Sequence, residues 1–95
     1  MGIPDYQSIM LPLLRATGDG QEHTVTSLVE ALAMTFKVTA DERRQLLPSG
    51  RQFLFDNRVG WARTYLKKSG LLSSPKRGHI QITQRGAQVL SQKLD

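Results

Sequence analysis

The sequence predicts one α+β domain that is mainly helical and carries a small β hairpin. Several stretches have apolar residues at helical spacing, whereas residues 79–83 alternate between apolar and polar as a half-buried strand does. A chain of 95 residues has room for one hydrophobic core. No repeat, low-complexity tract or long linker divides it, so we expect a single domain over residues 1–95.

The first predicted helix begins after Asp5, which can cap it. Its apolar residues recur at helical spacing: Tyr6, Ile9, Met10, Leu13 and Leu14. Pro12 removes a backbone hydrogen bond and should bend this helix. We expect one bent helix that ends at the turn formed by residues 18–20.

A short β-prone segment, residues 23–25, precedes the second predicted helix. We expect Thr26 or Ser27 to cap this helix, with Ser27 and Glu30 at the spacing of a capping box. Its buried stripe is predicted to be Leu28, Val29, Leu32 and Phe36.

The same capping-box spacing recurs at Thr39 and Glu42 and predicts a third, short helix through Leu46 and Leu47. Residues 48–50, Pro-Ser-Gly, should end it. The backbone amides of this turn, together with Arg51, are a weak candidate for holding a phosphate.

The fourth predicted helix runs from Asp56 to Ser69, and Gly70 should adopt the left-handed conformation at its C-terminal cap. A projection at 100° per residue places one narrow stripe toward the core: Phe55, Val59, Ala62 and Leu66. The opposite side then presents Asn57, Gly60, Thr64, Lys67 and Lys68, and the flanks carry Arg58, Trp61, Arg63 and Tyr65.

Two strands, residues 71–74 and 79–83, are predicted to form a hairpin around the turn Pro75-Lys76-Arg77-Gly78. Thr83 can cap a last helix whose apolar residues are Ala87, Leu90 and Leu94. The predicted order is helix, strand, helix, helix, helix, hairpin, helix. This order is that of a winged helix-turn-helix with an additional C-terminal helix, in which the fourth helix is the recognition helix and the hairpin is the wing.

The positive charge is concentrated in residues 51–85, which hold eight cations and one acid and carry a net charge of +7, against +5 for the whole chain. Clustered cations on a helix and an adjacent hairpin favour a polyanion partner, and we expect double-stranded DNA. Anionic lipid would satisfy the same electrostatics, so charge alone does not separate the two.

Residue types divide the candidate DNA-binding residues into three groups. Asn57, Gly60 and Thr64 suit base edges, and Arg58 and Arg63 suit either bases or phosphates. The candidates for phosphate contacts are Arg51, Lys67, Lys68, Lys76 and Arg77.

Other classes of site are not predicted. Cysteine is absent, the two histidines have no ligand pattern around them, and we expect no metal site, no cofactor and a cytoplasmic location. No apolar stretch approaches the roughly 20 residues of a membrane span. The acids contain no Asp/Glu-x-Lys motif, and no Ser/His/Asp grouping replaces it, so we expect no catalysis by this chain.

Three alternatives remain open. The basic surface could simply be solvated, and Arg58 could form a structural salt bridge, for instance with an acid of the second helix. In a protein-interaction module, Trp61 and Tyr65 would form an exposed patch that binds a second copy or a neighbouring domain. The DNA-binding domain of a transcription regulator would share the mechanism, with a dimer on a palindromic site.

One long run, residues 47–72, resembles the N-terminal domain of Mrr restriction endonucleases; it reads LPSGRQ-x-LFDNRVGWARTYLKK-x-GLL. The opening residues 3–6, IPDY, and the closing residues 82–86, IT-x-RG, are also similar to that family. The resemblance therefore covers nearly the whole chain. It implies a winged-helix DNA-binding module.

In the family, this module precedes a nuclease domain in enzymes that restrict DNA carrying modified, methylated bases. The resemblance therefore implies that the chain is part of a larger protein, and that its partners are DNA and a C-terminal nuclease domain of the same polypeptide. Mg²⁺ would be needed only by that nuclease domain. The resemblance does not say which residues, if any, sense a methyl group.

Overall fold

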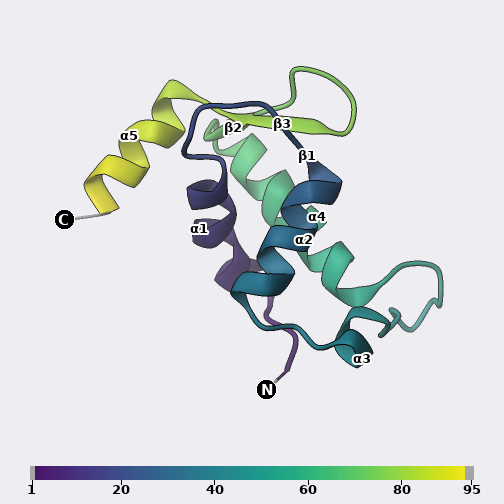
Figure 1. Cartoon of the computed structure of the whole chain (residues 1–95). Helices are drawn as coiled ribbons and strands as arrows, with labels where there is room; N and C mark the ends of the chain where they lie inside the picture. Colours follow the sequence, from purple (N-terminus) through teal and green to yellow (C-terminus); the bar gives the residue numbers. More distant parts are fainter. Residues whose placement is uncertain (1, 94–95) are drawn as a thin grey trace.

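The computed structural model describes residues 2–93, the side chain of residue 93 excepted, as five helices and three short strands (Figure 1). In chain order they are α1 (Tyr6–Ala16), β1 (His23–Thr24), α2 (Val25–Thr35), α3 (Ala40–Arg43), α4 (Leu54–Lys68), β2 (Leu72–Ser73), β3 (His79–Ile82) and α5 (Gln84–Lys93). The predicted class, mainly helical α+β, and the predicted order of elements are both confirmed. None of the described helices is long and apolar enough to cross a membrane.

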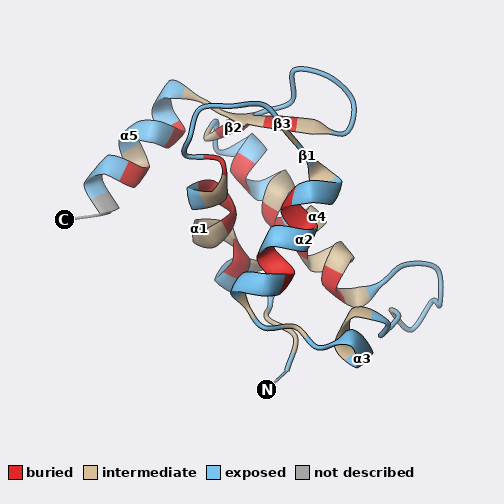
Figure 2. Ribbon diagram, viewed as in Figure 1, coloured by how far each residue is buried: buried red, intermediate tan, exposed pale blue. Residues whose placement is uncertain are grey.

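The core lies where α1, α2 and α4 face one another, and the sheet crosses one end of these helices (Figures 1 and 2). Its largest fully buried side chains include Ile9, Leu13 and Leu14 of α1, Leu32 of α2, Phe55 and Val59 of α4, and Ile80 of β3. The predicted stripe of α4 is confirmed, since Phe55, Val59, Ala62 and Leu66 are all buried. Because one side of α4 packs in this core, only its opposite side is available to contact a ligand.

The sheet has three antiparallel strands in the order β1-β3-β2, so the short strand predicted before the second helix pairs with the hairpin, a pairing that the sequence did not predict. Leu72 pairs with Ile82 in the hairpin, and His23 pairs with Ile80 on the other edge of β3. The paired segments are also shorter than predicted, at residues 72–73 and 79–82. The loop between them, residues 74–78, is exposed throughout.

Most helix caps that the sequence predicts are present. Asp5 accepts a hydrogen bond from the Ser8 amide at 2.8 Å, and Pro12 lies inside a single helix, α1. Thr39 and Glu42 form the predicted capping box of α3. Thr83 accepts from the Gly86 amide at the start of α5, and Gly70 has a φ of 78° after α4. Leu94, which was predicted to lie in the last helix, is outside the described residues.

The predicted start of α2 is wrong. Thr24 is its N-cap and accepts a hydrogen bond from the Ser27 amide at 3.1 Å, so neither Thr26 nor Ser27 caps this helix. The expected Ser27–Glu30 capping box is also absent, because the Ser27 hydroxyl donates to the Thr24 carbonyl and Glu30 pairs with Arg43. The physical reason is tertiary: the Val25 amide donates to the Gly78 carbonyl at 2.9 Å, which fixes the end of β1 and the first residue of α2.

The boundaries of α3 and α4 also differ from the prediction. α3 ends at Arg43, and Leu46 instead forms an isolated antiparallel bridge with Phe53 across the loop that contains Gly50. α4 begins at Leu54, two residues before Asp56, and ends at Lys68. Asp56 therefore lies in the first turn, where its negative charge is favourable to the helix dipole.

Candidate nucleic-acid interface

The outer side of α4 carries a shallow depression around Gly60, which we call the Gly60 depression. It has a volume of about 200 Å³ and is lined by Gln52, Asn57, Gly60, Trp61, Arg63 and Thr64. Four of the predicted DNA-binding residues, Asn57, Gly60, Arg63 and Thr64, are thus brought together. Gln52 was not predicted, because it lies in the loop before α4, outside the helical projection.

Two hydrogen bonds organise this depression. The Asn57 amide nitrogen donates to Gln52 Oε1 at 3.1 Å, which joins the loop before α4 to the helix. The Thr64 hydroxyl donates to the Gly60 carbonyl at 2.9 Å. The hydroxyl hydrogen of Thr64 is therefore used inside the helix, which leaves its Oγ1 as an acceptor and its methyl group as the apolar part of this side chain.

Exposed cations lie at both ends of this surface. Lys67 and Lys68 form the last turn of α4, and Lys76 and Arg77 lie in the 74–78 loop that follows β2. Arg51 is exposed in the loop before α4, near its other end. A helix of 15 residues is roughly 22 Å long, so these cations bracket a surface about as long as the width of a DNA duplex.

Most of these cations have no acidic partner. Among the described residues, Arg51, Lys67, Lys68 and Arg77 form no ion pair, whereas Lys76 Nζ lies 3.6 Å from Glu22 Oε2. The same Glu22 oxygen lies 2.8 Å from His79 Nδ1. Glu22 precedes β1, and its position beneath the 74–78 loop follows from the β1–β3 pairing, which the sequence did not reveal.

Arg58 is positioned differently from the other predicted residues. It is half-buried, and its guanidinium donates to the backbone carbonyls of Ile3 at 2.9 Å and Pro4 at 3.3 Å. The suggested salt bridge between Arg58 and an acid of the second helix is wrong, since Glu30 of α2 is bound by Arg43. Arg58 instead links the N-terminal segment to the middle of α4 through these hydrogen bonds.

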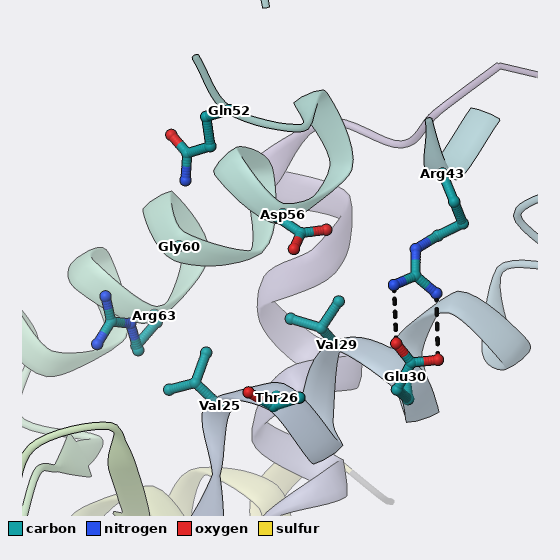
Figure 3. Close-up of a pocket in the computed structure, with 9 residues that line it drawn as sticks. All are labelled: Val25, Thr26, Val29, Glu30, Arg43, Gln52, Asp56, Gly60 and Arg63. Carbon is teal, nitrogen blue, oxygen red and sulfur yellow. Dashed lines mark hydrogen bonds and ion pairs between the residues drawn. The ribbon is translucent and has the colours of Figure 1, made fainter. Parts of the chain in front are cut away.

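A second hollow, the α2–α4 groove, lies on the other side of Gly60 and has a volume of about 240 Å³ (Figure 3). Arg43 closes one end through two hydrogen bonds to Glu30, at 2.8 and 3.2 Å. These hydrogen bonds lower the pKa of Glu30 and raise the pKa of Arg43. The charges of Glu30 and Asp56 make smaller contributions to the raised pKa of Arg43. Asp56 and Arg63 line the groove as well.

The charges of the α2–α4 groove balance, because two acids, Glu30 and Asp56, face two arginines, Arg43 and Arg63. Arg43 Nε, Asp56 Oδ1 and Arg63 Nε are buried there without a hydrogen-bond partner among residues 2–93. A balanced groove of this kind does not favour an anion. The outer surface of α4 and its flanking loops is therefore the better candidate for nucleic acid.

Two aromatic residues of α4, Trp61 and Tyr65, lie on its flank. Trp61 is half exposed, at 50%, and its ring centroid is 6.2 Å from that of Tyr65. Tyr65 stacks in turn on Tyr6 of α1, with the ring centroids 4.9 Å apart. Tyr65 thus contributes to packing between α1 and α4, whereas about half of the surface of Trp61 stays exposed on the rim of the Gly60 depression.

Fold and surface together define a small, mostly helical α+β domain with a basic helix side and a basic loop. The family described as the Mrr N-terminal domain matches residues 6–92, and the chain belongs to this family. This confirms the family that the sequence resemblance indicated.

One curated relative is the type IV methyl-directed restriction enzyme EcoKMrr of Escherichia coli (strain K12). The two sequences are 33% identical over 87 residues, which cover 90% of this chain and 28% of the enzyme. The chain therefore spans little more than a quarter of the length of that relative. No solved structure matches the chain.

Proposed function

We propose that this chain is a winged-helix module that binds double-stranded DNA and directs a restriction enzyme to its modified substrate. The observation that carries the proposal is the placement of exposed cations at both ends of the outer side of α4, most of which have no acidic partner among residues 2–93. The relative's name, which describes methyl-directed restriction, supports the substrate class. The cleavage chemistry, and the Mg²⁺ that it would need, are placed outside these 95 residues.

In this proposal α4 enters the major groove and the 74–78 loop, as the wing, lies along the backbone. Asn57, Gly60, Arg63 and Thr64 face the base edges, because they line one depression on the exposed side of the helix. Phosphates are bound by Arg51, Lys67, Lys68, Lys76 and Arg77. Arg58 acts indirectly, by holding residues 3 and 4 against α4.

The proposal is tested by fluorescence-anisotropy titration of a labelled duplex at several salt concentrations. If about five phosphates are neutralised, the slope of log affinity against log salt should be roughly −4 to −5. The double variant Lys76→Ala/Arg77→Ala should flatten this slope by about 1.8, since two phosphate contacts are lost. A slope near zero for the unaltered chain would refute DNA docking.

The matched control is Arg15→Ala/Arg44→Ala, which removes the same charge from elsewhere on the molecule. Arg15 lies in the last turn of α1, and Arg44 is paired with Asp41. This control should leave the slope closer to that of the unaltered chain than the loop variant does. Equal flattening by both variants would show that net charge, and not the 74–78 loop, governs binding.

A second candidate function is favoured by the exposed Trp61 ring. Half-exposed aromatic residues are frequent in protein interfaces, so this flank of α4 is a candidate surface for a second copy or a neighbouring domain. The two functions differ in the response of Trp61 fluorescence. A change on dilution of the protein that DNA does not affect would support the interaction module.

A further inference from the structure

Gly60 lies in the interior of α4 and on its exposed side, where glycine is unfavourable for helix stability compared with alanine. Packing within the domain does not require it. A Cβ built at this position meets no described atom within 4 Å, apart from the helix's own backbone and the adjoining residues. The missing side chain therefore leaves open space on the surface and nothing else in the described structure uses it.

Gly86, in α5, shows the opposite case. A Cβ at that position would collide with the carbonyl oxygen of Leu71 and would lie 2.7 Å from Ile82 Cγ1. Gly86 is thus needed for close packing of α5 against the β2–β3 hairpin. The contrast indicates that Gly60 is explained by something that approaches α4 from outside.

The walls of the Gly60 depression suit a small apolar group beside a hydrogen-bonding one. Trp61, which is half exposed, and Thr64, which carries a methyl group and donates its hydroxyl hydrogen to the Gly60 carbonyl, both line the depression. Asn57 uses its amide nitrogen toward Gln52, so its Oδ1 is left to accept a hydrogen bond. Arg63 adds a guanidinium at the rim, and Figure 3 shows the bare helix backbone at Gly60 between the side chains of Gln52 and Arg63.

We propose that the Gly60 depression receives the C5 methyl group of 5-methylcytosine in the major groove of duplex DNA. This inference rests on the proposed docking of α4. A cytosine presents its N4 amino group as a donor at the major-groove edge, with the C5 position beside it. Asn57 Oδ1 can accept from that amino group, while the methyl group fills the space that the missing Gly60 side chain leaves. Arg63 can pair with the O6 and N7 of a neighbouring guanine.

Thymine also carries a C5 methyl group, but it presents an acceptor, O4, where cytosine presents a donor. An acceptor opposite Asn57 Oδ1 is unfavourable, so the depression should prefer 5-methylcytosine to thymine. The burial of one methyl group predicts about fourfold tighter binding to the methylated duplex.

The test uses the 95-residue chain and duplexes of one sequence that differ only in their C5 groups. The reference duplex contains cytosine and deoxyuridine, and therefore no C5 methyl group. One arm replaces cytosine by 5-methylcytosine, a second replaces deoxyuridine by thymine, and a third carries N6-methyladenine. Anisotropy titration should give a dissociation constant about fourfold lower for the 5-methylcytosine duplex, with a smaller change for thymine.

Variants locate this preference on α4. Gly60→Ala should bring the ratio of the two dissociation constants, reference over methylated, to about one, because Cβ occupies the space of the methyl group. Thr64→Ser keeps the hydroxyl bond to Gly60 but lacks the methyl group, and should lower the ratio, whereas Thr64→Val should retain it. Gly2→Ala, at another glycine with open space around it, is the matched control and should keep the full ratio.

The outcomes separate this inference from the proposed function. Salt-sensitive binding with equal dissociation constants for the reference and methylated duplexes would overturn the inference and leave DNA docking intact. A preference that persists in Gly60→Ala, or one confined to thymine or N6-methyladenine, would overturn it as well. A lack of salt-sensitive binding to every duplex would refute the docking proposal, and the inference with it.

Discussion

The two sides of α4 differ in the burial and in the ion pairing of their side chains. Phe55 and Val59, on one side, are 0% and 1% exposed and belong to the core that α4 shares with α1 and α2. On the other side, Gly60 faces open space and the two lysines of the last turn have no acidic partner among residues 2–93. One helix therefore separates the residues that maintain the fold from those available to a ligand, and substitutions on the two sides should affect different measurements.

The largest effect is expected for Phe55→Ala on the buried side. Truncation of a fully buried phenylalanine typically lowers the free energy of unfolding by about 3 to 5 kcal/mol, which is a large part of the stability of a small domain. Urea unfolding followed by circular dichroism measures this loss.

The matched control for Phe55→Ala is Phe53→Ala. Phe53, the residue before α4, is 44% exposed, so its truncation should cost much less, about 1 kcal/mol or below. Comparable losses for the two variants would contradict the assignment of Phe55, and not Phe53, to the core.

A smaller effect is expected for Arg58→Ala, at the boundary between the two sides. The variant loses the hydrogen bonds to the carbonyls of Ile3 and Pro4, and should lower the free energy of unfolding by about 1 to 2 kcal/mol. Arg51→Ala, at an exposed arginine, should change it by less than about 0.5 kcal/mol. An Arg58→Ala variant of unchanged stability with a flatter salt dependence of DNA binding would instead make Arg58 a DNA contact.

The smallest effect concerns the ion pair at the end of the α2–α4 groove. Hydrogen bonds from Arg43 hold the pKa of Glu30 below its ordinary value of 4.5. A carboxyl whose pKa is lowered by folding contributes stability above its unfolded-state pKa, and this contribution is lost as the pH falls through the folded-state value. Asp5 and Asp19 also have lowered pKa values, so the informative quantity is a difference between variants.

Glu30→Gln should therefore show less loss of stability than the unaltered chain as the pH falls from 4.5 downward. Thermal unfolding at a series of pH values, for both proteins, measures the difference. Arg43→Gln serves as the reciprocal control, because it removes the partner and should reduce the acid sensitivity in the same way. Parallel pH profiles for Glu30→Gln and the unaltered chain would show that the pair does not contribute.

The sequence was sufficient for several features that are determined locally. The caps at Asp5, Thr39 and Thr83 depend on residues three positions apart, and the buried stripe of α4 depends on helical geometry alone. The start of α2 was missed because it is set by the Val25 amide and the Gly78 carbonyl, which are far apart in the chain. The end of α3 was missed for a similar reason, since Leu46 bridges to Phe53.

In the candidate site, too, the features that depend on local spacing could be predicted and those that depend on long-range contacts could not. The grouping of Asn57, Gly60 and Thr64 follows from their spacing on one helix, and the structure brings them to one depression. The carbonyl partners of Arg58 depend on where the N-terminal segment runs, and the proximity of Glu22 to Lys76 depends on a strand pairing across the whole chain. Neither has a signal in the local sequence.

The strand order β1-β3-β2 has a consequence for how the chain acquires its fold. The central strand, His79–Ile82, is the last to be synthesised, and its partner His23–Thr24 lies more than fifty residues earlier. Contacts of such long sequence separation carry a high loop-closure entropy and form late in folding. On a ribosome, the three helices of the core can therefore collapse early, but the sheet closes only after residue 82 has emerged.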